Sequence, residues 1–261
     1  MRPVGKRRRA GAAFTLLEVL FAMLVLAILA AGLAIPLSTQ VAMRRQEDTR
    51  RILEEAREAL LGFAATHGRL PCPATAASRG EESFAPGGDA RAGDCSNFHD
   101  GFLPAAAIGL APLDEEGFLR DGWGSPANRI RYAVFGAGRS VGGVANPLTR
   151  VDGMREATLA ALGDAPAFLV VCGAGASTGG AGCGPAANQL TRRAAFVLLS
   201  TGPSAALRPA PGREESRNLD ASGVFVSREP SVEPGNEFDD FLTWVPVSVL
   251  AGRLVAAGRL P

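Results

Sequence analysis

Histidine, tyrosine and closely spaced cysteines are scarce in this 261-residue chain, which contains two histidines, one tyrosine and four cysteines. No two cysteines are arranged as Cys-x-x-Cys, and the histidines, His67 and His99, stand alone. A structural zinc site needs four cysteine or histidine ligands, which are usually supplied as closely spaced pairs. The sequence therefore argues against a zinc centre.

Convincing catalytic and nucleotide-binding patterns are also lacking. The glycine-rich stretch Cys172–Gly180 has Thr178 where a dinucleotide fingerprint requires its third glycine, and it lacks the Gly-Lys-Ser/Thr ending of a phosphate-binding loop. His67 and Cys72 are close in sequence, but nothing supplies the third group that would orient such a pair for nucleophilic attack. We therefore predict that the chain is not an enzyme and requires no cofactor.

Charge is nearly balanced, with 27 basic and 26 acidic residues and a formal net charge of +1. A nucleic-acid-binding surface normally shows a marked basic excess, so no nucleic-acid partner is expected. The basic residues nevertheless gather before residue 10, where Arg2, Lys6, Arg7, Arg8 and Arg9 precede a long apolar run. Such a basic leader indicates a cytoplasmic N-terminus under the positive-inside rule.

The apolar run is the most informative feature of the chain. No ionisable side chain occurs from Val19 to Met43, a stretch of about 25 residues that is long enough to span a bilayer. Glu18 lies at its start, and a carboxylate inside a membrane helix costs about 2.5–3.5 kcal/mol on insertion scales. An ordinary secretory signal with cleavage near Gly32 and Ala34 is the alternative, but its apolar region is only about 7–15 residues long.

The string Ala-Phe-Thr-Leu-Leu-Glu at residues 13–18, with the helix that follows, resembles the signal of type IV prepilins and type II secretion pseudopilins. The resemblance implies that prepilin peptidase cleaves between Ala13 and Phe14 and then methylates the new amino group of Phe14. It also implies that Glu18 pairs with the N-terminal amine of a neighbouring subunit, so that each buried charge lies beside its opposite. Ala13 departs from the glycine that usually precedes the cleavage site.

The same resemblance sets the expected organisation of the chain. Residues 1–13 form a cytoplasmic leader, residues 14–43 a transmembrane helix, residues 44–67 the periplasmic half of that helix, and residues 68–261 a periplasmic globular domain. The chain is then a single-pass protein of the bacterial inner membrane. Its partners are prepilin peptidase, other pilin or pseudopilin subunits and the membrane itself.

Apolar residues recur at helical spacing after the membrane segment, which predicts one helix from about Thr15 to Thr66, ended by His67 and Gly68. A short helix is predicted over Met154–Leu162 and a final one over Val247–Ala257. Strands are predicted at five positions, namely Arg129–Phe135, Phe168–Cys172, Ala195–Ser200, Val224–Ser227 and Phe241–Val245. One long helix followed by separated strands predicts an α+β fold with the helix packed on an antiparallel sheet, as in pilins.

Four cysteines in an exported domain indicate disulfides, for which three pairings are possible. Nearest-neighbour pairing joins Cys72 to Cys95 and Cys172 to Cys183. Each closed loop would contribute about 3 kcal/mol through the entropy of the unfolded chain.

Two further segments resemble parts of the major type II pseudopilin. The segment Asp-Gly-Trp-Gly-Ser-Pro at residues 121–126, followed by Tyr132, provides an aromatic anchor in a tight turn, for which we expect a packing role. Residues 236–244 resemble the segment before which that protein binds calcium. Glu237, Asp239 and Asp240 supply oxygen ligands of the kind that calcium prefers, although the EF-hand spacing is absent. The alternative is a solvated acidic turn.

These patterns together predict a structural subunit, either a pseudopilin or a minor pilin. The long sequence between the two tryptophan segments favours a minor, tip or initiating subunit. The alternative is a membrane-anchored periplasmic binding protein that never assembles into a fibre. Processing by prepilin peptidase distinguishes the two.

Overall fold

The computed structural model describes residues 15–175, 182–206 and 212–261, and within the first helix it leaves out the side chains of residues 29–38. The chain divides into two compact units, Met1–Arg44 and Arg45–Pro261. The main elements in chain order are α1 (Leu16–His67), β1 (Gly101–Phe102), β2 (Arg131–Val134), β3 (Ser140–Val141), β4 (Val144–Ala145), α2 (Gly153–Ala157), α3 (Leu159–Asp164), β5 (Leu169–Cys172), β6 (Gln189–Ser200), β7 (Val224–Val226), β8 (Phe241–Pro246) and α4 (Val247–Ala256). Short 3₁₀ helices are η1 (Pro126–Asn128), η2 (Ala186–Asn188), η3 (Pro203–Ala206) and η4 (Ser216–Leu219).

Helix α1 has local signals at both ends. At the start, the backbone amide of Glu18 donates to the carbonyl of Thr15 at 3.0 Å and approaches its hydroxyl at 3.4 Å. Thr-x-x-Glu is the pattern of a capping box, in which the threonine satisfies a free amide of the first turn. At the end, Gly68 adopts a left-handed φ of 69° and its amide donates to Ala64, so glycine terminates the helix as predicted.

The part of α1 that lies in the second unit is amphipathic. One face buries residues at helical spacing, namely Leu53, Ala56, Leu60, Leu61 and Ala64. The opposite face is exposed and charged, and there Arg51 bridges Asp48 at 3.1 Å and Glu55 at 3.2 Å. Exposed pairs of this kind contribute about 0.3–0.5 kcal/mol each, so apolar burial is what holds the helix on the domain.

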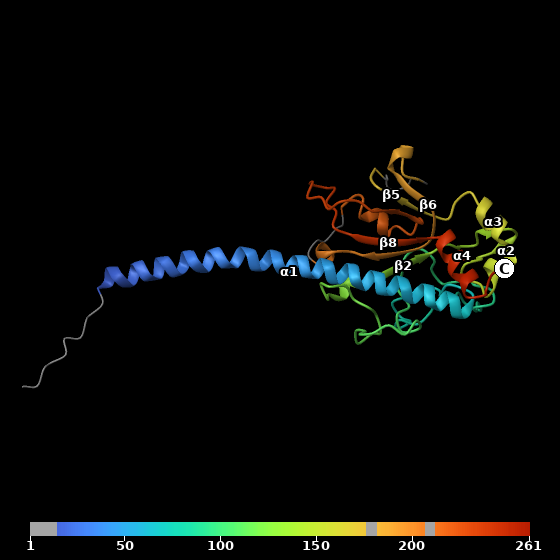
Figure 1. Cartoon of the computed structure of the whole chain (residues 1–261), viewed down its shortest axis with the longest axis horizontal. Helices are drawn as coiled ribbons and strands as arrows, with labels where there is room; N and C mark the ends of the chain where they lie inside the picture. Colours follow the sequence, from blue (N-terminus) through green and yellow to red (C-terminus); the bar gives the residue numbers. More distant parts are fainter. Residues whose placement is uncertain (1–14, 176–181, 207–211) are drawn as a thin grey trace, which may run out of the picture. The chain divides into compact units, whose positions relative to one another are not determined.

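The main sheet has six strands in the order β1-β2-β6-β5-β7, and β8 also pairs with β6 (Figure 1). Every pairing is antiparallel except that of β5 with β7, where Val170 is opposite Val224 and Cys172 opposite Val226. The fold is therefore α+β, as predicted, with a sheet that is mixed rather than wholly antiparallel. Strands β3 and β4 form a separate two-stranded sheet.

Each of the five predicted strands coincides with an observed one. Strand β6 differs most, because it begins at Gln189 rather than at Ala195. The predicted helix at 154–162 is two helices, α2 and α3, separated by Thr158 with a φ of 67°. The hydroxyl of Thr158 then accepts a hydrogen bond from the amide of Ala161 and so caps α3.

The core of the second unit lies between the sheet and the two helices α1 and α4. Buried residues of β2, β6 and α4, such as Tyr132, Phe196 and Leu250, belong to one cluster with the apolar face of α1. The rings of Tyr132 and Phe196 meet edge to face, 6.0 Å apart, and the buried hydroxyl of Tyr132 donates to the carbonyl of Pro71. One continuous core explains why a helix and strands that are distant in sequence form a single domain.

Candidate functional site

The start of α1 presents an exposed apolar surface among the residues that the structure describes. Ten large apolar residues from Leu16 to Ile28 are exposed, with Leu16 at 79% and Phe21 at 64%. Glu18 is exposed on the same helix, in its first turn. A helix that is apolar on all sides requires a nonpolar environment or other helices around it. Ala13 and Phe14, the predicted cleavage site, lie outside the described residues.

A family model described as the prokaryotic N-terminal methylation motif matches residues 8–34. The chain carries a type IV prepilin-like signal. This signal includes Ala13, Phe14 and Glu18, so the comparison supports the resemblance on which the sequence prediction rests. No curated protein and no solved structure matches the chain. The resemblance of the C-terminal segments to the major pseudopilin therefore stays a prediction.

The prepilin-like signal points to membrane anchoring and to a structural rather than a catalytic protein. Among the residues that the structure describes, no helix is both long enough and apolar enough to cross a membrane. The side chains of residues 29–38, which lie within the predicted span 14–43, are not among those described. The span and its orientation stay predictions from the sequence.

Both predicted disulfides are present in the domain. Cys72 is bonded to Cys95 and Cys172 to Cys183, with Cα–Cα distances of 5.3 Å in both cases. The first closes the irregular segment after α1, and the second joins the end of β5 to the segment before η2. Short cross-links of this kind stabilise a loop-rich domain by restricting its unfolded state.

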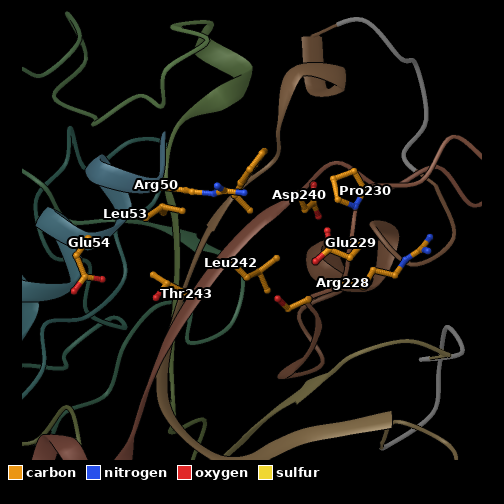
Figure 2. Close-up of a pocket in the computed structure, with 11 residues that line it drawn as sticks. Arg50, Leu53, Glu54, Arg228, Glu229, Pro230, Asp240, Leu242 and Thr243 are labelled. Carbon is orange, nitrogen blue, oxygen red and sulfur yellow. The ribbon is translucent and has the colours of Figure 1, made fainter. Parts of the chain in front are cut away.

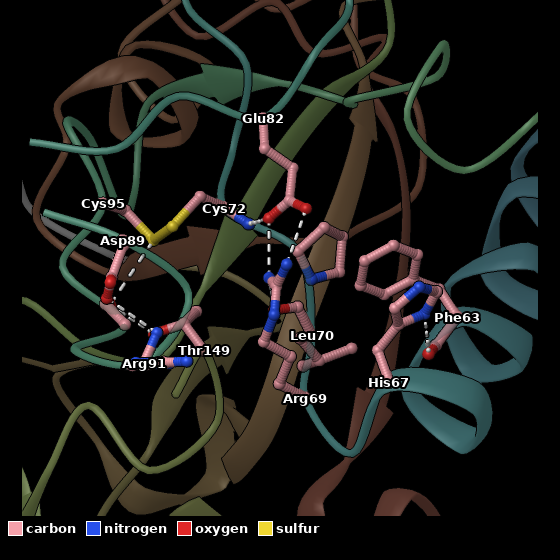
Figure 3. A network of polar contacts seen from close by, with 12 residues as sticks. Phe63, His67, Arg69, Leu70, Cys72, Glu82, Asp89, Arg91, Cys95 and Thr149 are labelled. Atoms are coloured by element: carbon pink, nitrogen blue, oxygen red, sulfur yellow. Dashed lines mark hydrogen bonds and ion pairs between the residues drawn. A yellow bond between two sulfur atoms is a disulfide. The ribbon is translucent and has the colours of Figure 1, made fainter. Parts of the chain in front are cut away.

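A buried ion pair lies beside the first disulfide (Figure 3). The guanidinium of Arg69 donates to both carboxylate oxygens of Glu82, at 2.6 and 2.8 Å, and the amide of Cys72 donates to the same carboxylate at 2.9 Å. The two side chains are 8% and 13% exposed. Bidentate pairs of this kind fix geometry, so the pair holds the chain that leaves α1 against the loop that carries Glu82.

The tryptophan turn has the packing role expected of it. The amide of Trp123 donates to the carboxylate of Asp121 at 2.9 Å, and the indole ring lies 5.4 Å from the ring of Phe241 in β8. Asp121 also accepts hydrogen bonds from Ser200 and Asn128. Burial raises the pKa of Asp121, although these hydrogen bonds oppose the shift. The turn thus connects α1 with two strands of the sheet, β6 through Ser200 and β8 through Phe241.

The acidic segment before β8 forms a carboxylate group with an unexpected member. Oxygen atoms of Glu215, Asp239 and Asp240 all lie within 4.8 Å of one another. Glu215 is buried in the loop that leads into η4, and the amide of Asp239 donates to it at 2.8 Å. Glu237, the third residue in the predicted ligand set, is not part of this group, so its role in binding calcium stays a prediction.

Glu215 escaped sequence reasoning because it lies 24 positions before Asp239. Calcium is bound by oxygen atoms at about 2.3–2.6 Å, so oxygens less than 5 Å apart fit around one ion. The arrangement is compatible with calcium in its spacing and in the chemistry of its donors.

A groove of about 350 Å³ adjoins this acidic group (Figure 2). Arg50, Leu53 and Glu54 of α1 line one side, and Arg228 and Asp240 are among the residues on the other. Its arginines have partners within the domain, because Arg228 pairs with Glu214 at 2.6 Å and Arg50 lies over the ring of Phe241. The groove offers mixed and largely satisfied charges, and nothing in it favours one ligand.

The residues that sequence analysis weighed for catalysis are held in other contacts. Cys72 is in a disulfide, and His67 stacks on Phe63 at 4.0 Å (Figure 3). Residues 175–179 read Gly-Ala-Ser-Thr-Gly, which matches the spacing of a hydrolase nucleophile elbow. Ser177 and the residues directly after it lie outside the described residues.

Proposed function

We propose that the chain is a pseudopilin or minor pilin that prepilin peptidase cleaves after Ala13 and methylates on Phe14. The match of the methylation motif to residues 8–34 carries this proposal. The exposed apolar surface at the start of α1 supports it, because a fibre of bundled N-terminal helices supplies the nonpolar surroundings that such a surface needs.

Glu18 has a defined place in this proposal. Its carboxylate is in the first turn of α1, where the positive end of the helix dipole favours an acidic group. On assembly, the amine of Phe14 from a neighbouring subunit would complete the pair inside the apolar bundle. A charge buried without its partner is strongly unfavourable, so this pairing would set the register between subunits.

The globular unit Arg45–Pro261 favours a minor subunit over the major one. It has several irregular segments between short strands, two of them fastened by disulfides. These segments provide surface in excess of what the core needs. A subunit at the tip of a fibre, or one that initiates it, would use such surface for contacts with other components.

The experiment that tests this function is the mass of the mature protein. The full chain, expressed with prepilin peptidase and extracted from membranes, is expected to begin at N-methyl-Phe14. Peptide mapping of the same sample without reductant is expected to recover Cys72 linked to Cys95 and Cys172 to Cys183. A mature N-terminus near Ala34, or an intact Met1, would contradict the proposal and favour a secreted protein or an unprocessed anchored binding protein.

We also propose that Glu215, Asp239 and Asp240 bind calcium, on the evidence of their spacing. A ligand that binds only the folded state raises the melting temperature. The full chain in a neutral detergent is expected to melt at a higher temperature with millimolar calcium than with chelator. Glu215→Gln is expected to abolish the shift and Glu237→Gln to preserve it. A shift lost only with Glu237→Gln would restore the set predicted from sequence, and no shift in the unmodified chain would refute calcium binding.

A further inference from the structure

A second pocket lies where the parallel strands β5 and β7 begin. Parallel strands start at the same edge of a sheet, so the residues before β5 and those before β7 meet there. Phe168, Ser222 and Gly223 line the pocket from these two positions, together with Arg192 of β6. The volume of the pocket is about 520 Å³, which is far larger than the roughly 30 Å³ that one water occupies in the liquid.

The pocket carries an excess of positive charge. Three arginines and one aspartate line it, namely Arg139, Arg192, Arg217 and Asp220, which leaves a formal charge of +2. The aspartate is engaged within the domain, since its carboxylate accepts from Arg217 at 2.7 Å and from the amide of Ser222 at 2.9 Å. No acidic residue that lines the pocket is therefore left to balance the charges of Arg139 and Arg192.

Arg139 and Arg192 have no carboxylate partner among the described residues. Arg139 is half-buried, lies over the ring of Phe135 at 4.8 Å and donates a hydrogen bond to the carbonyl of Phe168 at 3.4 Å. Elsewhere in the domain, the side chains of Arg69 and Arg129 are 8% and 12% exposed, and each faces a carboxylate. Burial without a counter-charge lowers the pKa of Arg139.

His99 packs against the same corner of the pocket. A Cβ built on Gly223 would lie 3.2 Å from both Nη2 of Arg139 and Cε1 of His99, so the two side chains converge on this glycine. Nδ1 of His99 interacts with the carbonyl of Ala221 at 3.1 Å, while its buried Nε2 has no hydrogen-bond partner in the described part of the chain. His99 thus reports on any ligand that engages Arg139.

We propose that this pocket binds an oxyanion group, a phosphate, sulfate or carboxylate carried on a larger ligand. Guanidinium groups present planar forks of N–H donors that match the paired oxygens of such groups. Arg139 and Arg192 would supply the charge and these donors, and the size of the pocket leaves room for the rest of the ligand. The site is independent of the N-terminal helix and adds a binding role to the globular unit.

The two histidines of the chain make a direct test possible. The full-length protein is labelled with ¹⁵N-histidine in a neutral detergent and titrated with inorganic phosphate, sulfate or succinate at constant pH and ionic strength. We expect the ring signals of His99 to shift saturably, whereas those of His67, which stacks on Phe63 at the end of α1, stay in place. A response to phosphate and sulfate alone would identify a tetrahedral group, and a response to succinate alone a carboxylate.

Variants separate the pocket from general effects of salt and charge. The double variant Arg139→Gln with Arg192→Gln is expected to raise the dissociation constant of the anion by at least about tenfold, because hydrogen bonds to a charged group are lost. Arg155→Gln removes one positive charge, as each of the two pocket substitutions does, at an exposed residue of α2 outside the pocket, and it is expected to bind like the unmodified protein. Arg192→Gln alone, at an exposed position, provides a variant that folds if the double variant does not.

Three results would overturn the proposal. The first is the absence of a saturable shift of His99 with all three anions. The second is an equal shift of His67 and His99, which indicates a bulk effect of the salt. The third is an unchanged dissociation constant in the folded arginine variants, or an equal loss in Arg155→Gln.

Discussion

The hydroxyl of Thr49 accepts a hydrogen bond from the backbone amide of Gly122 over 3.0 Å and donates one to the carbonyl of Arg45 over 2.8 Å. Thr49 is fully buried on α1, and Gly122 belongs to the tryptophan turn. A Cβ on Gly122 would lie 2.3 Å from the carbonyl oxygen of Arg45, so only glycine allows the turn to approach the helix this closely. This contact attaches α1 to the loop region of its own domain.

The first prediction follows from that contact. Thr49→Val preserves the shape of the side chain but leaves the amide of Gly122 without its acceptor. An unsatisfied buried donor costs about 1–3 kcal/mol, so we expect the free energy of unfolding to fall by that amount in urea titrations. Thr66→Val is the control, because Thr66 is exposed and, in the described structure, its hydroxyl bonds only to residues of its own helix. A loss below about 0.5 kcal/mol for Thr49→Val would contradict the assignment.

The second prediction concerns Arg69 and Glu82. Glu82→Gln leaves the guanidinium of Arg69 buried without its charge partner, and removing one partner of a buried pair costs about 3–5 kcal/mol. We expect a matching loss of unfolding free energy in denaturant titrations of the oxidised protein. Arg69→Met combined with Glu82→Leu removes both charges and is expected to cost less than Glu82→Gln alone. If the double variant is instead less stable than Glu82→Gln, the attraction within the ion pair exceeds the free-energy cost of removing its two charges from water.

Acid sensitivity at Asp114 is the third prediction. Burial alone would raise the pKa of Asp114, but hydrogen bonds from the amide of Phe118 and the guanidinium groups of Arg129 and Arg120 outweigh it and lower the pKa below its ordinary value of 3.8. The unfolded chain therefore takes up this proton more readily than the folded chain. The contribution of Asp114 to stability is fully present above the ordinary value and is lost as the pH falls through the lowered one.

Asp114→Asn removes this contribution and tests its sign. The variant is expected to unfold at a lower urea concentration than the unmodified chain near neutral pH, and the difference is expected to shrink as the pH falls to about 3. Asp164→Asn, at an exposed site without an ion pair in the described structure, is expected to show a difference that does not change with pH in this way. If the stability difference between Asp114→Asn and the unmodified chain grew as the pH fell, burial would outweigh the hydrogen bonds and the pKa of Asp114 would be raised instead.

Local pattern was enough to predict the elements that form the core. The apolar spacing of Ala56, Leu60 and Ala64 predicted the buried face of α1, and Gly68 predicted its end. The apolar run Phe168–Cys172 predicted β5, whose residues are all buried on the sheet, and the run Phe241–Val245 predicted β8, whose residues are half-buried except for the buried Val245. Positions that must be buried require apolar residues, so the spacing of apolar residues predicts these helices and strands.

Elements that depend on distant partners were harder to predict. The first residues of β6 read Gln-Leu-Thr-Arg-Arg and are mostly polar, yet they pair with β5 through Gln189 and Thr191. The parallel pairing of β5 with β7 also has no local signal, because direction within a sheet is set by the connections. Glu215 and the arginine pocket could not be predicted from local sequence either, because their residues come together only after the chain has folded.

The last prediction tests the proposed role of Glu18 in assembly. Glu18→Gln preserves the volume of the side chain and removes its charge. Cleavage after Ala13 is expected to continue, since the peptidase acts before the helix begins, and the globular unit is expected to melt as in the unmodified chain. Incorporation into fibres is expected to fall, because the amine of Phe14 in a neighbouring subunit loses its counter-charge in an apolar bundle. Crosslinking of both proteins, each co-expressed with the assembly machinery, measures that incorporation.

The structure calls for one further control, because Glu18 is also part of the local capping pattern with Thr15. If Glu18 acted only through the capping pattern of its own helix, Thr15→Ala would impair assembly more than Glu18→Gln, since glutamine can replace glutamate in a capping box whereas alanine cannot replace threonine. If Glu18 acts through a neighbouring amine, Thr15→Ala is expected to assemble much better than Glu18→Gln. An isolated membrane anchor would behave in a third way, and Glu18→Gln would insert more readily because a costly charge has been removed. Equal incorporation of Glu18→Gln and the unmodified chain would refute the intersubunit pair, whereas a selective loss at Glu18 supports it.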